Sequence, residues 1–353
     1  MKILITGGCG FLGSNLAAHY LEQGAEVVII DSLVREGSRK NLQWLRDKAS
    51  EMQLTFVCGD LANEGVVKTV FQLHAPFHFI CHVGGQVAMT TSISDPRRDM
   101  LTNIVGTFNV LEATRELSPE AFVAYSSTNK VYGDLETLSY EEKEFRYCLS
   151  DYRDGLDETL PLDFSTPYGC SKGSADQYVR DWYRMFGIKT VVFRHSSIYG
   201  GRQFSSFDQG WIGWFCKKAV EQKMATDSGK KVSAFSISGT GKQVRDVLHA
   251  KDIISLYETA YKHRDKIAGE VFNIGGGTRN SLSLLELFLY LSNLVGLDKL
   301  EFKSGPRRKS DQNVFIANIG KVCRFMPWMP SVTFEDGVSS MTGWVRSTSE
   351  NAS

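Results

Sequence analysis

The sequence predicts an α/β fold in which a doubly wound parallel sheet carries a smaller C-terminal α/β domain. Three observations predict it. Short apolar runs alternate with helical patterns through the first 200 residues or so, as in βα repeats. A cluster of glycines lies between the first apolar run and the first helical pattern. After residue 200 the alternation weakens, and aromatic and charged residues gather instead.

The glycine cluster is typical of a phosphate cradle. The apolar run Ile3–Thr6 predicts a strand and Ser14–Gln23 predicts a helix. Between them, Gly7 can adopt a positive φ, Gly10 lets the backbone approach a pyrophosphate, and Gly13 lets the helix lie close to the strand. The free N–H groups of the helix N-terminus favour phosphate there. The segment therefore predicts a Rossmann-type dinucleotide site.

A carboxylate at the end of the second strand indicates which dinucleotide binds. The run Glu26–Ile30 ends in Asp31, which follows Gly13 by 18 residues. That spacing is close to the offset of about 20 residues expected for the acid that binds the adenosine ribose. Because a carboxylate repels a 2′-phosphate, we predict NAD rather than NADP. The alternative is a strand–turn–helix unit that binds no ligand.

The remaining elements of the first half continue the βα alternation. Further strands are predicted at Leu54–Cys58, His78–His82, Ala121–Ser126 and Thr190–Arg194, and helices at Lys40–Ala49, Asn63–Leu73, Arg98–Leu117 and Ser171–Phe186. Ligands of such sheets bind beyond the carboxyl ends of the strands. Three strands end in polar or glycine-rich segments that fit a cofactor groove, namely Asp60-Leu61, Gly84-Gly85-Gln86 and Ser126-Ser127-Thr128.

The second half predicts a separate, smaller unit. We expect a hairpin around Ser238–Gly241, helices at Asp252–Tyr261 and Ser283–Leu294, and a strand at Val271–Ile274. We assign residues 1–199 to the NAD-binding Rossmann domain, with 246–274 returning to it. Residues 200–245 and 275–346 would bind the substrate, and 347–353 would form a disordered tail.

Composition excludes several classes of function. Lys+Arg and Asp+Glu both number 40, so the formal net charge is zero and no nucleic-acid partner is predicted. No apolar run is long enough to cross a membrane, and the N-terminus has no signal-peptide pattern. The seven scattered cysteines suggest reduced thiols in a cytoplasmic protein. His74 and His78 are separated by Pro76, which breaks a helix, so no metal site is predicted.

Tyr168 and Lys172 form a candidate acid/base pair. Their i, i+4 spacing places both on one face of a helix. A free tyrosine has a pKa near ~10, and a nearby ammonium stabilises the phenolate and lowers that pKa. The positive nicotinamide ring would add to the effect and give a base usable near neutrality. A chance pair on a solvated helix is the alternative.

The motifs together resemble the extended short-chain dehydrogenases/reductases that act on nucleotide sugars. The resemblance covers nearly the whole chain and rests on the glycine loop, Asp31, Asp60-Leu61, Asn103–Thr107, Tyr125–Gly133 and Tyr168-x-x-x-Lys172, in this order. It implies that Thr128 is the hydroxyl partner, Tyr168 the acid/base and Lys172 its electrostatic support.

Motifs and resemblance together predict the binding residues. Tightly bound NAD is expected to contact Gly7, Gly10, Phe11, Leu12, Gly13, Asp31, Ser32, Arg35, Asp60, Leu61, Val83, Gly84, Gly85, Gln86, Asn103, Ser126, Ser127, Tyr168, Lys172, His195 and Ser196. The substrate is expected to contact Gln86, Thr90, Thr128, Asn129, Ser197, Arg202, Gln209, Arg245 and Arg308. The resemblance implies that the last two arginines hold the diphosphate, for which guanidinium is suited.

The residues after Thr128 reduce the number of reaction types that fit this chain. Family 4,6-dehydratases carry Asp-Glu there to eliminate water, whereas this chain has Asn129-Lys130, which cannot supply those carboxylates. A reductase would need exchangeable NADPH, which Asp31 opposes. An epimerase that retains its NAD fits best.

Longer strings resemble the CDP-paratose 2-epimerases, also called CDP-tyvelose 2-epimerases. They span residues 85–93, 126–136, 167–173, 194–204 and 208–216. Ser197 and Gly201 stand where the wider family has Asn and Pro, and Val83-Gly84 replaces its usual Leu-Ala.

The resemblance implies an isomerase that inverts C2 of a CDP-deoxyhexose through a 2-keto intermediate, in O-antigen or lipopolysaccharide biosynthesis. It also implies a homodimer or homotetramer, formed through the helices at Arg98–Leu117 and Ser171–Phe186. The alternatives are an epimerase acting at C4 or C2 of a UDP- or GDP-sugar, and a dinucleotide-binding regulator that has lost catalysis.

Overall fold

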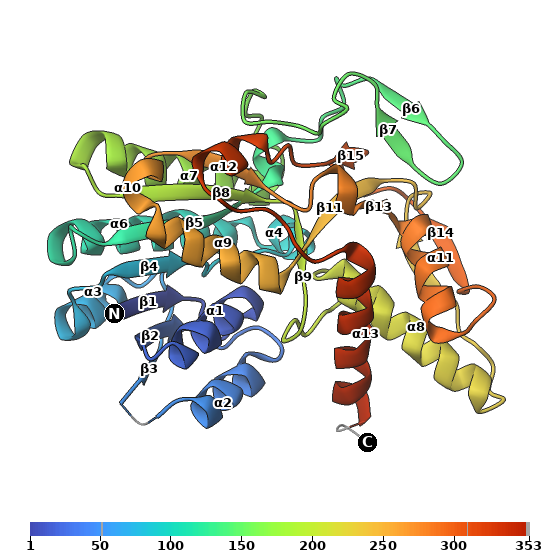
Figure 1. The fold of residues 1–353 in the computed structure, drawn as a ribbon, viewed down its shortest axis with the longest axis horizontal. Helices are drawn as coiled ribbons and strands as arrows, with labels where there is room; N and C mark the ends of the chain where they lie inside the picture. Colours follow the sequence, from blue (N-terminus) through green and yellow to red (C-terminus); the bar gives the residue numbers. More distant parts are fainter. Residues whose placement is uncertain (51, 309, 351–353) are drawn as a thin grey trace.

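A seven-stranded parallel sheet forms the larger part of the molecule (Figure 1). The computed structural model describes residues 1–50, 52–308 and 310–350. The strand order is β12-β8-β5-β4-β1-β2-β3, so the order reverses between β1 and β4, where ligands of such sheets bind. The strands are β1 (Lys2–Thr6), β2 (Glu26–Asp31), β3 (Leu54–Cys58), β4 (Phe79–His82), β5 (Phe122–Thr128), β8 (Thr190–His195) and β12 (Val271–Ile274). The predicted fold class is confirmed.

Alternation along each strand divides the core into two layers. Ile3 and Ile5 of β1 lie in one apolar cluster, and Leu4 between them lies in the other. The first cluster is covered by α1 (Phe11–Glu22), α2 (Ser38–Lys48), α9 (Ala250–Lys262), α10 (Arg264–Ile267) and α12 (Gly320–Phe325). The second is covered by α3 (Glu64–His74), α6 (Gly106–Leu117) and α7 (Thr166–Phe186). Burial on both faces explains why the middle of each strand is mostly apolar.

The smaller part, on the right of Figure 1, packs helices against short strands. Its core joins α8 (Trp211–Asp227), α11 (Leu284–Val295) and α13 (Phe334–Glu350). β10 (Phe235–Ser238) pairs with β14 (Phe302–Gly305). β11 (Val244–His249) pairs with β9 (Ser197–Tyr199), β13 (Ser281–Ser283) and β15 (Val314–Phe315). The short elements are α4 (Met89–Ser94), α5 (Pro96–Asp99), the π-helical η1 (Met100–Val105), the 3₁₀ turns η2 (Asn129–Tyr132) and η3 (Thr278–Asn280), and the hairpin of β6 (Tyr140–Glu142) and β7 (Tyr147–Leu149).

Three predicted features differ from the structure. The hairpin around Ser238–Gly241 is wrong, because β10 and β11 turn there but enter different sheets. The helix predicted at Arg98–Leu117 is interrupted by the π-helical turn η1. Residues 347–350 of the expected tail continue α13, and residues 351–353 lie outside the described residues.

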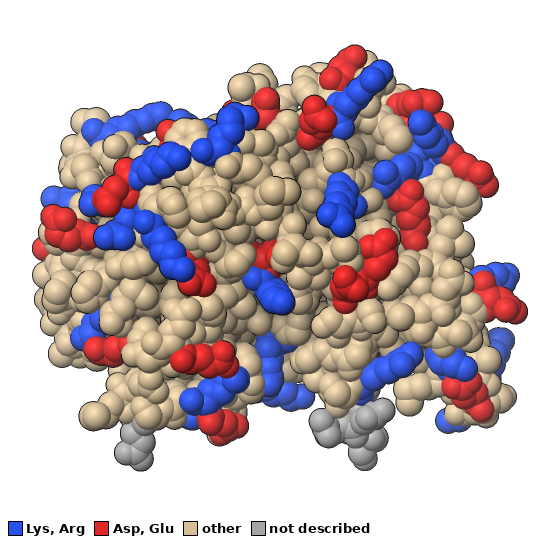
Figure 2. All heavy atoms as spheres, in the orientation of Figure 1, with Lys and Arg blue, Asp and Glu red and all other residues tan. Residues whose placement is uncertain are grey.

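Charged residues of both signs are mixed on the surface, as the equal numbers of basic and acidic residues suggest. On the face in Figure 2, Lys and Arg mix with Asp and Glu and form no field of one sign. Among the described helices, none is long and apolar enough to cross a membrane.

Candidate active site

The glycine loop brings the carboxyl ends of β1 and β4 into contact. Gly7 has a φ of +66°, and a Cβ there would lie 2.6 Å from the Cα of Gly84. A Cβ on Gly13 would lie 2.2 Å from the carbonyl oxygen of Gly7, so α1 could not approach the loop with any larger residue. Gly10 precedes the first residue of α1 and faces the open cavity. The close approach leaves the helix N-terminus free for an anion.

A cavity of about 420 Å³ extends from this loop along the sheet edge. Asp31 lines it, with Oδ2 accepting from the Cys9 N–H at 2.9 Å and Oδ1 from the Leu33 N–H at 2.8 Å. The other predicted cofactor residues in its lining are Gly7, Gly10, Phe11, Leu12, Gly13, Ser32, Arg35, Asp60, Leu61, Val83, Gly84, Gly85, Gln86, Ser126, Ser127, Tyr168, His195 and Ser196. Asn103 and Lys172 lie buried behind this lining.

A second cavity of about 310 Å³ adjoins the first. Thr128, Tyr168, Ser197 and Gln209 line both cavities. Asn129, Arg245 and Arg308 line only the second, and Arg202 lines only the first. Thr90 is exposed on α4 and, of the predicted substrate residues, is the one that lines neither. Tyr168, the candidate acid/base, and Thr128 therefore lie where the two cavities meet, and Lys172 lines neither cavity.

Burial controls the acidity of Tyr168. It lies in the first turn of α7, and Thr128 hydrogen-bonds to its phenol. Burial raises the pKa of Tyr168 to about 12, against the lowering effects of the Thr128 hydrogen bond and of Arg35. The structure does not support the expectation that Lys172 lowers the pKa of Tyr168, because the Lys172 ammonium contacts the Ser126 carbonyl and the Tyr125 ring instead.

The Lys172 ammonium lies against the end of β5. Its Nζ donates to the carbonyl oxygen of Ser126 at 2.5 Å and lies 4.2 Å from the ring centroid of Tyr125. Burial lowers the pKa of Lys172 to about 7, while Asp176 and Asp99 raise it. Lys172 therefore fastens α7 to the end of β5, behind the lining of the first cavity.

The second cavity has cationic and aromatic walls. The Nη2 of Arg245 contacts Asp311 at 2.7 Å, and the Nε of Arg308 donates to the Ser238 hydroxyl at 3.2 Å. Lys130 also faces the cavity, and burial lowers its pKa to about 7. Each guanidinium keeps further N–H donors that can bind an anion. The aromatic wall comes from Phe207, Trp211 and Trp214.

Several side chains of the first cavity fit a dinucleotide. Both ring nitrogens of His195 are buried without a hydrogen-bond partner, and so is Nη2 of Arg35. Burial and the Lys172 charge lower the pKa of His195 to about 3, so its ring is neutral and can both donate and accept. Unpartnered polar atoms at a cavity suit a polar ligand. With Asp31 and the glycine loop, they fit NAD.

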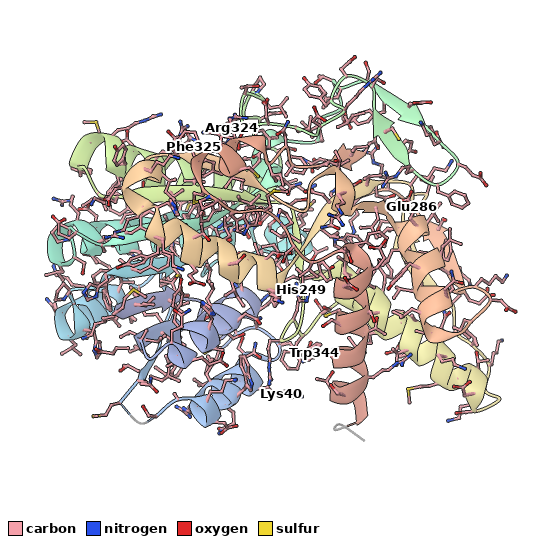
Figure 3. The ribbon with its side chains drawn as sticks, viewed as in Figure 1. Lys40, His249, Glu286, Arg324, Phe325 and Trp344 are labelled. Atoms are coloured by element: carbon pink, nitrogen blue, oxygen red, sulfur yellow. The ribbon has the colours of Figure 1, made fainter. Side chains whose placement is uncertain are left out.

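Residues 200–206, here called the strap, cross from the smaller part of the molecule to the glycine loop. The Asn41 amide donates both to the Cys9 carbonyl at 3.1 Å and to the Arg202 carbonyl at 3.2 Å. Phe204 packs against Trp344 with ring centroids 5.2 Å apart, and the Nζ of Lys40 lies 5.5 Å from its ring. Figure 3 shows Lys40 and Trp344 near each other where α2 faces α13. The strap thus closes one side of the first cavity.

Several lining residues were not predicted from the sequence. In the first cavity these include Asn41, Arg98, Gln203 and Phe204, and in the second Lys130, Phe207, Trp211, Trp214 and Asp311. The aromatic cluster after residue 200 was visible in the sequence and could have indicated the second cavity. Asn41 had no signal, because its role depends on two backbone carbonyls distant in sequence.

The fold, the glycine loop and the paired cavities define a dinucleotide-dependent enzyme with a substrate cavity beside its cofactor cavity. Residues 3–275 match the NAD dependent epimerase/dehydratase family. The chain therefore belongs to this family, and its cofactor is NAD.

Among its relatives, the chain is 52% identical to the CDP-paratose 2-epimerase of Salmonella typhi, over 98% of this chain and 100% of that protein. This confirms the resemblance drawn from the motifs. Two solved structures are also similar. The UDP-glucose 4-epimerase of Thermotoga maritima with UDP-glucose has a TM-score of 0.79 and 27% identity, covering 99% of each chain. The dTDP-glucose 4,6-dehydratase of Streptomyces venezuelae with NAD bound has a TM-score of 0.80 and 25% identity, covering 99% of this chain and 98% of that chain.

Proposed function

We propose that this protein is an NAD-retaining isomerase that inverts C2 of a CDP-activated deoxyhexose, converting CDP-paratose to CDP-tyvelose. The observation that carries the proposal is the placement of Thr128 and Tyr168 at the junction of the two cavities. There a sugar in the second cavity can meet the cofactor in the first. The 52% identity to a CDP-paratose 2-epimerase supports the choice of substrate and carbon.

The chemistry follows from the weak acidity of the C2 hydrogen. That carbon carries a hydroxyl and has no neighbouring carbonyl, so direct proton removal is unfavourable. NAD, when bound, supplies acceptance and return of the C2 hydrogen as hydride. Tyr168 takes the proton of the C2 hydroxyl and later returns it, and Thr128 orients that hydroxyl. The Thr128 hydrogen bond and the positive nicotinamide of bound NAD would favour the phenolate that the buried Tyr168 must form.

The second cavity would hold the substrate while the sugar turns. Arg245 and Arg308 bind the diphosphate, for which planar guanidinium groups are suited. Trp211 and Trp214 offer faces on which a base can stack. A 2-keto sugar is planar at C2, so a turn about the anchored diphosphate presents its other face. A dideoxy sugar has few polar groups to resist that turn.

The dehydration carried out by some members of the family is not expected here. The positions after Thr128 hold Asn129, whose amide donates to the Gln312 side chain at 2.8 Å, and Lys130, whose Nζ donates to the Ser310 carbonyl at 3.3 Å. Neither side chain is a carboxylic acid that could help water leave. Incubation with CDP-glucose, which keeps its C6 hydroxyl, should therefore yield no 4-keto-6-deoxy product.

Isotope labelling tests the reaction. CDP-paratose deuterated at C2 should give a product inverted at C2 that keeps the label, and solvent deuterium should not enter. Substantial exchange of solvent hydrogen at C2 would contradict hydride return. Turnover of UDP- or GDP-sugars instead, with inversion at C4 or C2, would favour the alternative epimerase. Failure to turn over any nucleotide sugar, with NAD bound, would favour a regulator.

The proposal extends to domains, assembly and location. Residues 1–199 with 246–274 would bind NAD, and 200–245 with 275–346 would bind the nucleotide sugar.

A homodimer, or a homotetramer built from it, would form through α6 and α7, where Phe108, Tyr178 and Phe186 are partly exposed and cluster around Trp182. We place the enzyme in the cytoplasm, where its product would supply O-antigen or lipopolysaccharide assembly.

A further inference from the structure

Lys130 is a cation of the second cavity to which the proposed reaction gives no task. Its backbone N–H donates to the Thr128 hydroxyl oxygen at 3.3 Å. A Cβ on Gly169, the residue after Tyr168, would lie 3.1 Å from the Lys130 carbonyl oxygen. The backbone of Lys130 therefore contacts Thr128 and lies against the first turn of α7, which carries Tyr168. Its position relative to both groups that meet the reacting hydroxyl is fixed.

The side chain of Lys130 extends from there to the loop that precedes β15. Its Nζ donates to the Ser310 carbonyl oxygen at 3.3 Å and lies 3.8 Å from Oδ1 of Asp311. The same Oδ1 accepts from Nη2 of Arg245 at 2.7 Å. The Lys130 side chain is 15% exposed and that of Arg245 is 13% exposed. Both residues line the second cavity, and an ammonium has three N–H donors, so Lys130 keeps one for a ligand.

The cluster around Asp311 has an excess of positive charge. Lys130 and Arg245 share its single carboxylate, while Asp134 and Arg307 act on Lys130 from farther away with opposite signs. Burial, followed by the charge of Arg245, lowers the pKa of Lys130 to about 7. An anion in the cavity would stabilise the buried ammonium that has lost its water. The contacts and the charge of this cluster therefore suit a phosphate group.

The cations of this cavity are attached to different ends of it. Of the described cations in the lining, which are Lys130, Arg245 and Arg308, Lys130 is the one with a hydrogen bond to Thr128. Arg308 instead donates to Ser238 of β10. A phosphate bound by Lys130 would therefore lie next to the catalytic hydroxyls, and one bound by Arg308 would lie nearer β10.

The carbon that reacts decides where a phosphate is needed. In a nucleoside diphosphate sugar, the phosphorus bonded to the sugar is three bonds from C2 and five bonds from C4. An enzyme that reacts at C2 must therefore bind this β-phosphate beside its acid/base, whereas an enzyme that reacts at C4 binds it farther away. A buried cation fixed beside Thr128 meets the first requirement.

We propose that Lys130 binds the β-phosphate of the substrate and thereby holds C2, rather than C4, against the hydroxyls of Thr128 and Tyr168. Arg245 and Arg308 bind the remaining oxygens of the diphosphate. The choice of carbon rests on the proposed function, whereas the contact between Lys130 and a β-phosphate does not.

Nucleotides without a sugar test the phosphate contact directly. CDP carries the β-phosphate and CMP lacks it, and titration calorimetry of the NAD-loaded protein measures both affinities. Lys130→Met removes the ammonium and keeps a side chain of similar length. It should weaken CDP binding about 10- to 100-fold, as expected for loss of a hydrogen bond to a charged group, and leave CMP binding within about twofold of wild type.

Arg307→Met is the matched control. Arg307 is exposed, donates to the Asp311 carbonyl oxygen on the same loop and lines neither cavity. Its removal takes away one positive charge and one loop contact, so the ratio of CDP to CMP affinity should stay at the wild-type value. If Lys130→Met does not fold, Lys130→Gln, which can still donate to the Ser310 carbonyl, takes its place.

Three results would overturn the contact. Equal weakening of CDP and CMP in Lys130→Met would assign the lysine a structural role. Unchanged CDP binding would show that no β-phosphate contacts it. Weakening of CDP by the same factor in Arg307→Met would show that overall charge, rather than a contact, attracts the nucleotide.

Failure of the proposed function gives a different result. UDP with UMP and GDP with GMP are titrated in the same way, and the pair that the wild-type protein binds most tightly is used for the variants. A preference for UDP or GDP would contradict a CDP-sugar substrate and leave the test of Lys130 intact. Absence of binding by all six nucleotides would overturn both proposals.

Kinetics with CDP-paratose test the choice of carbon. Lys130→Met should lower kcat as well as kcat/KM, because C2 is no longer held at the acid/base. A change confined to KM would contradict the choice of C2 by Lys130, because the lysine would then bind substrate and transition state equally. If the wild-type enzyme does not turn over CDP-paratose, the proposed function fails, while the comparison of CDP with CMP still decides the phosphate contact.

Discussion

Replacement of Asp31 by Asn should weaken NAD binding and reduce the preference for NAD over NADP. Asp31 lies at the carboxyl end of β2 and lines the first cavity. Its two oxygens accept from the N–H groups of Cys9 and Leu33, so the carboxylate supports two loops as well as a ligand. Asparagine has almost the same size but keeps one acceptor oxygen and carries no charge. The hydrogen bond to the ribose and one hydrogen bond to a loop should therefore be weakened together.

The size of the effect follows from the strength of a hydrogen bond between the ribose and a charged acceptor. Such a bond contributes about 1.5–3 kcal/mol. Its removal should therefore weaken NAD binding about 10- to 150-fold. NADP binding should weaken less, because removal of the carboxylate also removes its repulsion of the 2′-phosphate. Removal of one loop hydrogen bond lowers the free energy of unfolding, but burial already raises the pKa of Asp31, so relief of that desolvation offsets part of the decrease.

Titration calorimetry on protein stripped of NAD measures both affinities. Thermal unfolding of the same stripped protein measures how much the hydrogen bonds from the two loops to residue 31 contribute to stability. Asp31→Ala removes both loop hydrogen bonds and should unfold at a lower temperature than Asp31→Asn. An Asp31→Asn protein with wild-type affinity for NAD and an unchanged NAD/NADP ratio would refute the reasoning, because the carboxylate would then serve the loops alone.

Three further predictions concern the acid/base, the strap and the buried ion pair. Tyr168→Phe should lower kcat by about 10²- to 10⁴-fold while NAD stays bound, because it removes the proton carrier and little volume; turnover within tenfold of wild type would assign the base elsewhere. Phe204→Ala should speed NAD loss on dialysis about tenfold, because its contacts with Trp344 and Lys40 hold the strap; unchanged retention would show that the strap does not retain the cofactor. Arg194→Met should lower the free energy of unfolding by about 3–5 kcal/mol, because Asp176 is left buried without its partner. Adding Asp176→Leu should restore much of that stability in chemical denaturation, and a double variant as unstable as the single one would contradict the charge argument.

Local patterns predicted the strands, the glycine loop and the positions of the main site residues. β1 and β2 were predictable because their apolar residues alternate between two buried layers, and each side chain's layer follows from its place in the strand. Gly7 and Gly13 were predictable because the turn needs a positive φ and a close helix, which are properties of adjacent residues. Asp31 followed from its spacing to the loop.

The tertiary structure alone decided which distant groups meet. The turn near Gly239 was correct, but the partners of β10 and β11 are chosen by residues far along the chain, so the hairpin was wrong. Residues 347–350 are helical because α13 buries Val338, Met341 and Val345 in the core of the smaller part. The pKa values of Tyr168 and Lys172 depend first on the burial of these side chains, which only the folded chain defines. Burial and electrostatic effects between distant residues leave no periodic pattern or fixed spacing in a sequence. They are defined only when the chain has folded.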